Sequence, residues 1–351
     1  CVLGMVVRRE REIREFVETP FYRVLSAIGE SGQTFEGEWR AVKGSRYFES
    51  FDLYKENGFK EKDKAEALIQ YLKENNEPLT CQITSIEKKK EKKNPPLLYN
   101  LAELQNECSK RFKISPDETL RIVQELYEKK LDMLQELYEE KMVTYPRTDA
   151  RVLSTAVAKE IHKNLNGLMK YDVAVPYLKE IVSFGSHKGL EKTRYVNDKQ
   201  ITDHYAIIPT GQGMGALNGL SHLSKQVYEV IVRRFLSIFY PPAVYQKVAI
   251  VTKIKEESFF SSFKVLAEEG YLKVAGNPAK KKAKTNNADS PDDGQNDGQM
   301  EADVNFFEKI KTLKKGMSLP VQALDIKEGK TSPPKRYNSG SLILAMENAG
   351  Q

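Results

Sequence analysis

The segment VTYPRTDARVLS, residues 143–154, ends a long amphipathic stretch and places a phenol, a proline, a guanidinium and a carboxylate within five positions. Pro146 cannot continue an α-helix, and it pushes the preceding Tyr145 towards extended backbone geometry. We therefore expect a helix to end here, with Tyr145 at its exit and outside the apolar stripe. Asp149 or Ser154 can then cap a second helix.

The helix expected before this segment has a clear start and contains a repeat. Its start, Ser115-Pro116-Asp117-Glu118, combines an N-cap residue, a proline suited to the first turn and a glutamate that can complete a capping box. The sequence QELYEKKLDML (124–134) is followed by QELYEEKMVTY (135–145), and this offset of 11 residues is close to three helical turns. The duplication therefore keeps one apolar stripe on the same face, formed by Leu120, Val123, Tyr127, Leu131, Leu134, Tyr138 and Met142.

Elsewhere the chain alternates between strand-like and helix-like segments. Strand-like patterns cover residues 21–47, 79–93 and 243–275, and helix-like patterns cover 1–16, 61–74 and most of 97–240. Because β-rich parts flank the helical block, we predict a mixed α and β protein in which a β-rich domain is interrupted by a helical one. Residues 276–303 are of low complexity, with AKKKAK followed by acidic residues, and we expect a flexible loop there.

Composition narrows the class of protein. The 351 residues, 40% hydrophobic and 30% charged, suit two or three soluble globular domains, and a net charge of +6 permits an anionic partner without requiring one. The three cysteines, Cys1, Cys81 and Cys108, form no CxxC pair, which excludes a zinc ribbon and indicates a reducing compartment. No apolar run reaches membrane-spanning length, so we expect no membrane partner. The chain begins without Met and ends in ENAGQ, and we expect an internal piece of a longer protein.

Three stretches hold side chains suited to phosphate chemistry. The phenol of Tyr145 has an ordinary pKa of about 10 and needs help as a nucleophile. Arg147, two residues on, is always charged and can stabilise the charge that develops on phosphorus. His204, in the polar turn of TDHYAIIPT (202–210), can donate to a phosphate oxygen or protonate a leaving hydroxyl. Arg336, in PPKRYNSGSLILAMENAGQ (333–351), can meet a backbone phosphate.

The last stretch also predicts a helix that starts at Ser339 or Ser341 and presents a stripe of Leu342, Ala345 and Met346. Each candidate side chain has a plainer interpretation as well. Tyr145 can simply pack on a loop, His204 can bond the backbone of a turn, and both arginines can be solvated.

Taken together, TYPRTDARVLS, RYVNDKQITDHYAIIPT and PPKRYNSGSLILAMENAG resemble the type IA DNA topoisomerases, in particular their bacterial topoisomerase III branch. LGMVVRREREIREF and LAELQNECSKRFKISPDETLRIVQELYEKK are also similar to segments of that family, so the resemblance covers nearly the whole chain. It implies a multidomain arch, a β-rich domain interrupted by a helical catalytic domain. The implied domains are a strand-binding domain from 1–18 and 326–351, the two halves of the β-rich arch from 19–94 and 223–325, and a helical domain from 95–222.

The resemblance also implies roles for individual residues. Tyr145 matches the nucleophile that forms a covalent link to the 5′ phosphate of a broken strand, and Arg147 matches the arginine that holds the scissile phosphate. His204 matches the histidine beside that phosphate, although Tyr205 follows it where the family usually has a second His or a Glu. The residues assigned to weaker or indirect DNA contact are Thr148, Asp149, Arg151 and Arg336.

Cofactors and partners follow from the same resemblance. The family's acidic N-terminal domain has no counterpart in the sequence, so Mg²⁺ is implied for the complete enzyme with ligands outside this chain. We therefore expect this chain alone not to complete the reaction. The implied partner is single-stranded DNA, with no small-molecule substrate, and we expect a cytoplasmic, nucleoid-associated monomer. No GxxxxGK[ST] motif occurs, which fits an ATP-independent isomerase whose phosphotyrosine stores the bond energy.

Two other classes of protein stay open. The chain can be a non-catalytic single-stranded DNA-binding module, or a tyrosine recombinase or relaxase that attaches to a different strand end or uses a His cluster. The tandem QELYE repeat is also longer than the family's usual single copy. If three added turns were not absorbed by the helix, they would displace Tyr145 by about 16 Å.

Overall fold

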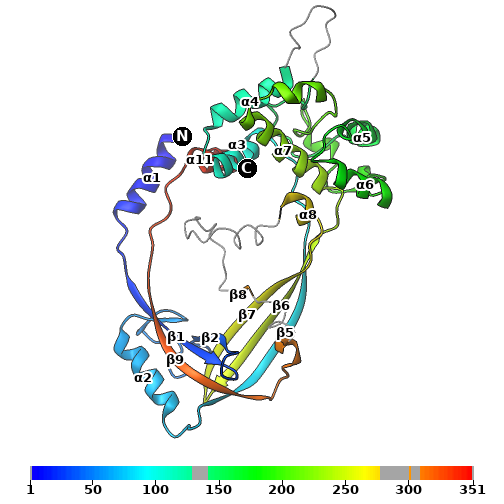
Figure 1. Cartoon of the computed structure of the whole chain (residues 1–351). Coiled ribbons are helices and arrows are strands. Elements are labelled where there is room, and N and C mark those ends of the chain that lie inside the picture. Colours follow the sequence, from blue (N-terminus) through cyan, green and yellow to red (C-terminus); the bar gives the residue numbers. More distant parts are fainter. Residues whose placement is uncertain (1, 129–140, 277–299, 302–308, 350–351) are drawn as a thin grey trace, which may run out of the picture.

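The computed structural model describes residues 2–128, 141–276, 300–301 and 309–349, which form an arch (Figure 1). Helices form one end of the arch and a twisted sheet forms the other. The strands β5 (Thr80–Lys93), β6 (Ala243–Ile254) and β7 (Glu257–Glu268) rise along one side. The other side consists of α1 (Val2–Arg14) and the segment that follows β9 (Ser318–Lys330).

The sheet closes on itself into a barrel. The strand β1 (Pro20–Ile28) pairs with both β9 and β2 (Phe35–Arg40), and the hydrogen-bonded order continues from β2 through β7, β6 and β5 back to β9. These six pairings are all antiparallel. Because the order returns to its starting strand, each of the six strands has a neighbour on both sides. The short strands β3 (Leu53–Lys55) and β4 (Gly58–Phe59) attach beside β1, and β8 (Met300–Glu301) pairs in parallel with β7.

The barrel has an aromatic core around a buried carboxylate. Trp39 stacks on Phe59 with ring centroids 4.8 Å apart, and its indole Nε1 donates to Glu257 at 2.6 Å. Glu257 is fully buried and also accepts from the backbone N of Arg46 at 2.7 Å, so both of its oxygens have donors. The helix α2 (Lys62–Lys73) covers this core with Ala65, Leu68 and Leu72.

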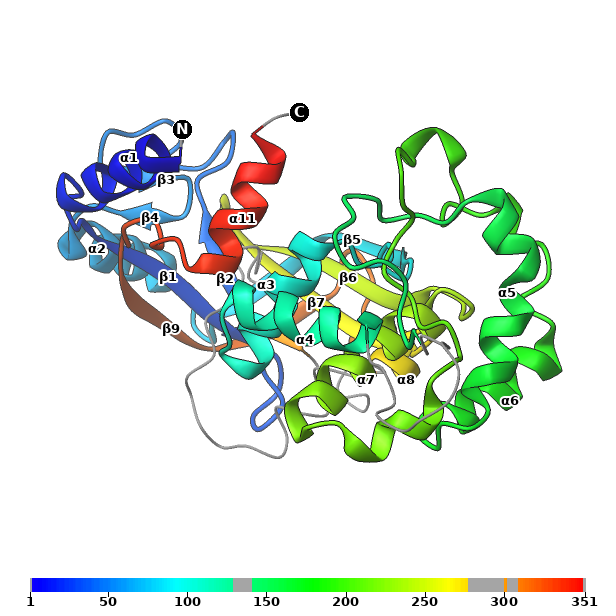
Figure 2. The same cartoon turned by 90° about the horizontal axis from the view of Figure 1, so that it is seen from above.

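The helical domain has a separate core. Its helices are α3 (Leu101–Phe112), α4 (Pro116–Glu128), α5 (Thr155–Leu168), α6 (Val175–Phe184), α7 (His222–Ser237) and α8 (Leu272–Ala275), with short 3₁₀ turns at Leu190–Lys192, Asp198–Gln200 and Met214–Gly219. The expected boundary at residue 222/223 falls after the first residue of α7, whose buried side chains belong to the helical core, and the barrel resumes at β6. Seen from above, the helices spread from α1 through α11 (Ser339–Asn348), α3, α4 and α7 to α5 and α6 (Figure 2).

The strand pattern predicted through residue 275 is wrong beyond Glu268, because the chain turns into α8 instead. Gly270 makes this turn with φ +50°, and a Cβ there would lie 2.4 Å from the carbonyl oxygen of Pro242. Tyr271 N then donates to Pro241 O at 3.0 Å, which fixes the short helix against the end of α7.

The helix starts also differ in detail from expectation. Ser115 Oγ accepts from Glu118 N at 3.1 Å as predicted, but the Glu118 carboxylate pairs with Arg121 and does not complete a capping box. Ser154 caps α5 through Val157 N, as one of the two alternatives predicted. The helix α11 starts at Ser339, one of the two predicted starts, with Asn338 as its N-cap, and Met346 on its expected stripe is 43% exposed.

Two predicted features lie partly outside the described residues. They are the repeat, of which residues 129–140 end the first copy and begin the second, and the low-complexity segment, at 277–299 and 302–303. Within the described ranges, no helix is both long and apolar enough to cross a bilayer.

Candidate active site

The segment 141–150, which we call the tyrosine loop, is fixed by the segment 206–209. Val143 forms an isolated antiparallel bridge with Pro209. Thr144 N donates to Ile208 O at 3.0 Å, and Thr144 Oγ1 donates to Ala206 O at 2.9 Å and accepts from Ile208 N at 2.9 Å. Because Ala206 and Ile208 are fully buried, the loop is anchored on the helical core directly before Tyr145.

Tyr145 lies between two aromatic rings. The His204 imidazole is 4.0 Å from it, centroid to centroid, with 32° between the ring planes. The Tyr127 ring on α4 meets it edge-on at 5.7 Å and 84°. Tyr145 is half-buried and His204 is exposed, so the phenol and the imidazole share one surface. The structure thus brings together two predicted site residues that are 59 positions apart in sequence.

Thr148 holds the backbone of His204. Its Oγ1 donates to His204 O at 3.0 Å and accepts from Ala150 N at 3.1 Å. The side chain is 4% exposed, so its hydroxyl is used within the protein. Thr148 therefore joins the two halves of the site instead of presenting its side chain to a ligand.

Arg147 is exposed on the same loop. With the Gln124 carboxamide turned so that both groups are satisfied, its oxygen accepts from Arg147 Nε at 3.2 Å and from Nη2 at 2.9 Å. No carboxylate among the described residues pairs with this guanidinium. Arg147 therefore keeps its full positive charge next to the tyrosine.

The other predicted residues are engaged elsewhere. The exposed Asp149 offers its backbone oxygen to Asn100 Nδ2 at 3.1 Å. Arg151 pairs with Glu103 at 2.7 Å and donates to Leu98 O, so its guanidinium ties the loop to α3.

Arg336 binds Glu10 through Nε at 2.8 Å and Nη2 at 3.2 Å, and this hydrogen bonding lowers the pKa of the Glu10 carboxyl. Arg336 lies between β9 and α11, outside the tyrosine loop. The Arg9 guanidinium carbon lies 4.4 Å from the ring centroid of the neighbouring Tyr337, in a cation–π contact. This cluster therefore joins α1 to the segment before α11.

Three contacts were not foreseen from the sequence: those of Gln124, Tyr127 and Asn100. Asn100 is fully buried, caps α3 through Glu103 N at 2.9 Å and donates to Glu347 of α11 at 2.5 Å. A signal for it existed, because an asparagine before LAEL is a standard N-cap pattern. No sequence pattern pointed to Gln124 and Tyr127, because the repeat contains a Gln and a Tyr at the same spacing in both copies.

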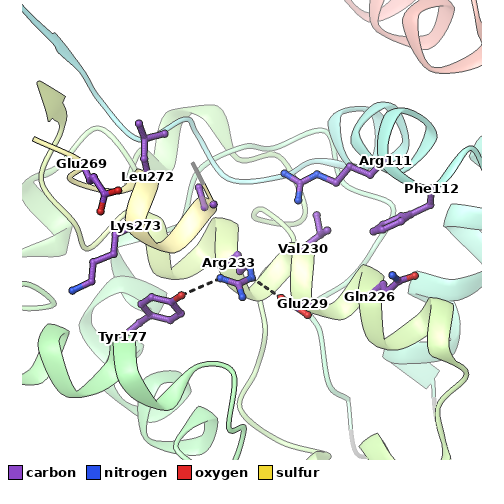
Figure 3. Close-up of a pocket in the computed structure, with 12 residues that line it drawn as sticks. Arg111, Phe112, Tyr177, Gln226, Glu229, Val230, Arg233, Glu269, Leu272 and Lys273 are labelled. Atoms are coloured by element: carbon purple, nitrogen blue, oxygen red, sulfur yellow. Dashed lines mark hydrogen bonds and ion pairs between the residues drawn. The ribbon is translucent and has the colours of Figure 1, made fainter. Parts of the chain in front are cut away.

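A separate cavity of about 830 Å³ lies between α3, α6, α7 and α8 (Figure 3). Arg233 points into it and donates to Tyr177 Oη at 3.2 Å, Glu229 Oε1 at 2.6 Å and Val274 O at 2.8 Å. Because these groups satisfy one another, we interpret the cavity as a junction that ties α8 to the helical core. It contains none of the predicted site residues.

Comparison with known proteins agrees with this architecture. The structure is similar to that of full-length topoisomerase I from Thermotoga maritima, with a TM-score of 0.60 and 22% sequence identity, covering 99% of this chain and 47% of that chain. At this identity the match establishes the fold, which is the arch of a type IA topoisomerase. A family model described as DNA topoisomerase matches residues 1–350. The chain therefore belongs to the DNA topoisomerase family, which confirms the resemblance and the fold class expected from the sequence.

Individual relatives are similar over the same range. The chain is 31% identical over 348 residues to "DNA topoisomerase 3" of Bacillus subtilis (strain 168), covering 99% of this chain and 41% of the relative. It is 32% identical over 351 residues to the protein of the same name from Shouchella clausii (strain KSM-K16), covering 99% of this chain and 40% of the relative. The chain thus spans about two fifths of the length of these relatives.

Proposed function

We propose that this chain supplies the nucleophile of a type IA topoisomerase, which cleaves and reseals one DNA strand through a 5′-phosphotyrosine intermediate. Passing another strand through the gap would relax or decatenate DNA. The main support is the contact between Tyr145 and His204, 4.0 Å between ring centroids, beside the exposed Arg147. A nucleophile, a proton donor and a fixed cation on one surface are the groups that phosphoryl transfer requires.

In the forward step, Tyr145 Oη attacks the phosphorus of a phosphodiester. The Oη–P bond forms and the P–O3′ bond breaks, which leaves a 5′-phosphotyrosyl strand and a free 3′-hydroxyl. The phenol releases its proton to solvent. The departing O3′ takes up a proton from His204, or from solvent where His204 instead hydrogen-bonds a non-bridging oxygen. Arg147 stabilises the negative charge that builds on the phosphate. Resealing is the reverse, so no nucleoside triphosphate is consumed.

Mg²⁺ is a general feature of this family, but the described residues do not supply a site for it. Among them, no three His, Cys, Asp or Glu side chains come together as metal ligands. The family resemblance implies that the Mg²⁺ ligands belong to the parts of the full-length protein outside this chain, and the steps above use only side chains of this chain. Single-stranded DNA is the expected partner, held through phosphate contacts with salt-dependent affinity, and the expected setting is a monomer in the bacterial cytoplasm.

The test is covalent capture by a protein extended to the full length of its relatives. A single-stranded oligonucleotide labelled at one end or the other is incubated with the protein and Mg²⁺, then denatured. We expect an adduct that carries only the 3′-end label and is absent in Tyr145→Phe. The matched control is Tyr205→Phe, which removes a neighbouring phenol and should leave the adduct unchanged.

Other outcomes identify the competing classes of protein. An adduct with the 5′-end label would indicate the opposite polarity of a tyrosine recombinase. Tight, salt-sensitive binding without any adduct would indicate a non-catalytic single-strand binding module.

A further inference from the structure

One face of α4 contacts both the proposed nucleophile and its arginine. Gln124 and Tyr127 are three residues apart on this helix, so their side chains project on the same side. Gln124 binds the Arg147 guanidinium, and the Tyr127 ring packs edge-on against Tyr145. The tyrosine loop is thus held from α4 as well as from the segment that carries His204.

The chemistry of an amide suits the contact with Arg147. Its oxygen accepts from both Nε and Nη2, which fixes the plane and direction of the guanidinium. A carboxylate in that place would bind more strongly, but it would neutralise the charge that the phosphate needs. Gln124 therefore orients Arg147 and leaves its charge and its remaining donors available for a ligand.

Tyr127 holds the tyrosine loop at two points. Its ring packs against that of Tyr145 at 84°, with centroids 5.7 Å apart, and its Oη accepts from Lys141 Nζ at 3.0 Å at the start of the loop. Lys141 Nζ also lies 4.5 Å from the centroid of the Tyr127 ring, a cation–π distance. Residues 127 and 141 are therefore in contact although 14 positions separate them.

The contacts with Arg147 and Tyr145 described above come from the first copy of the repeat. Gln124 and Tyr127 recur as Gln135 and Tyr138 in the second QELYE, so the sequence alone offers two equivalent sets. We infer that the first copy, through Gln124 and Tyr127, positions Arg147 and Tyr145 for transesterification. This inference rests on the proposed function for its catalytic consequence, but the positioning itself can be measured without it.

The first measurement follows hydrogen exchange at Arg147 Nε–H by NMR in this chain, with the signal assigned by its loss in Arg147→Lys. We expect exchange about tenfold faster in Gln124→Ala than in the unsubstituted chain, because one acceptor is lost. Gln135→Ala is the matched control and should leave the rate unchanged. Equal rates in Gln124→Ala and the unsubstituted chain would overturn the inference, and faster exchange in Gln135→Ala alone would transfer the role to the second copy.

The second measurement is the rate of adduct formation and the DNA affinity of the full-length protein. We expect Gln124→Ala and Tyr127→Ala to slow capture by about tenfold or more while DNA affinity changes less than about twofold, since misplacement of reacting groups lowers the chemical step. Gln135→Ala and Tyr138→Ala should behave as the parent does.

Gln124→Glu separates orientation from simple packing. It keeps an acceptor for Arg147 and should preserve slow exchange at Nε, yet it should slow capture as much as Gln124→Ala because it neutralises the guanidinium. Full capture activity in Gln124→Glu would contradict a role that depends on the charge of Arg147. If the unsubstituted protein forms no adduct at all, the proposed function fails, and the exchange measurement alone decides whether Gln124 positions Arg147.

Discussion

At the scale of single residues, local sequence indicated the tyrosine loop but not the side chains that hold it. Pro146 predicted a helix that ends directly before it, with Tyr145 at the exit. This is wrong in detail, because residues 141–145 are not helical: Val143 bridges to Pro209 and Thr144 pairs with Ile208, so Tyr145 lies on a loop. The partner of Thr148 is a backbone oxygen 56 residues away, and no local pattern encodes such a distance. For the same reason Arg151, a predicted DNA contact, proved to be paired with Glu103 from α3.

Thr148 gives a prediction about both stability and catalysis. In Thr148→Val, the buried Ala150 N–H and His204 carbonyl lose their partner, which should cost about 1–3 kcal/mol in the free energy of unfolding. Urea unfolding followed by circular dichroism measures this cost. Covalent capture should also slow, because His204 is no longer fixed beside Tyr145. Thr148→Ser keeps the hydroxyl and is the control, and equal losses in both variants would rule out the hydrogen bond as the cause.

His204 gives a prediction about the chemical step alone. His204→Asn keeps a hydrogen-bonding side chain but removes the group that can donate and accept protons, so capture should slow by at least about 100-fold. DNA affinity, measured by fluorescence anisotropy, should stay within about twofold of the parent. His162→Asn replaces an exposed histidine on α5 and serves as the comparison. A parallel loss of binding in His204→Asn would mean that His204 holds DNA and does not take part in proton transfer.

At the scale of secondary-structure elements, periodicity predicted α4 correctly from Pro116 to Glu128. It wrongly continued the helix to Met142, which lies in a non-helical segment and donates through its backbone N to Leu126 O. The duplicated QELYE raised the prospect of a displaced Tyr145. The contact between Tyr127 and Tyr145, 5.7 Å between centroids, keeps the nucleophile beside the first copy. Which copy meets the loop depends on tertiary packing, because both carry the same residues at the same spacing.

The hairpin that joins β6 to β7 supports a prediction about stability at this scale. Glu257 is fully buried and accepts from Trp39 Nε1 and Arg46 N, so Glu257→Gln would aim an amide NH₂ at one of two donors. We expect a loss of about 2–4 kcal/mol in the free energy of unfolding. Trp39 is the only tryptophan of the chain, so urea unfolding followed by its fluorescence measures the stability of the barrel directly.

Glu256→Gln is the matched control for that measurement. Glu256 is the preceding residue and accepts from Tyr71 Oη at 2.6 Å near the surface, and this hydrogen bond lowers the pKa of its carboxyl. Its replacement should cost less than about 1 kcal/mol. A cost as large as that of Glu257→Gln would show that charge at the turn, and not the buried pairing with Trp39, stabilises the hairpin.

At the scale of the whole molecule, the helical domain is an insertion into the barrel. The β5–β6 ladder ends with Lys93 opposite Ala243, so the chain leaves the barrel and returns to it at paired positions. The sequence predicted this arrangement, because β-rich parts on both sides of a helical block suit one interrupted sheet. It could not predict the closure of the barrel, since the β1–β9 pairs join opposite ends of the chain and nothing local selects those partners.

This architecture predicts that the two cores unfold separately, with the barrel first. Among the described residues, the barrel core and the helical core share no buried residue, and each contains a free cysteine, Cys81 and Cys108 respectively. The barrel region also buries the hydroxyls of Ser45 and Ser261 without hydrogen-bond partners among the described residues, and its core is the smaller one. We therefore expect Cys81 to become reactive at a urea concentration at least about 0.5 M below that for Cys108.

Thiol alkylation read by mass spectrometry measures this difference, because both cysteines are protected in the folded state. Burial raises the pKa of Cys81 to about 11 and that of Cys108 to about 12. An unfolded thiol has a pKa of about 8.5, so between that value and the folded pKa the unfolded chain binds fewer protons and stability falls as the pH rises. Both alkylation midpoints should thus move to lower urea between pH 8 and pH 10, and Cys81→Ala should reduce the pH dependence of barrel unfolding measured by Trp39 fluorescence. Alkylation curves for Cys81 and Cys108 that coincide at every pH would instead mean that the barrel and its helical insertion unfold as a single cooperative unit.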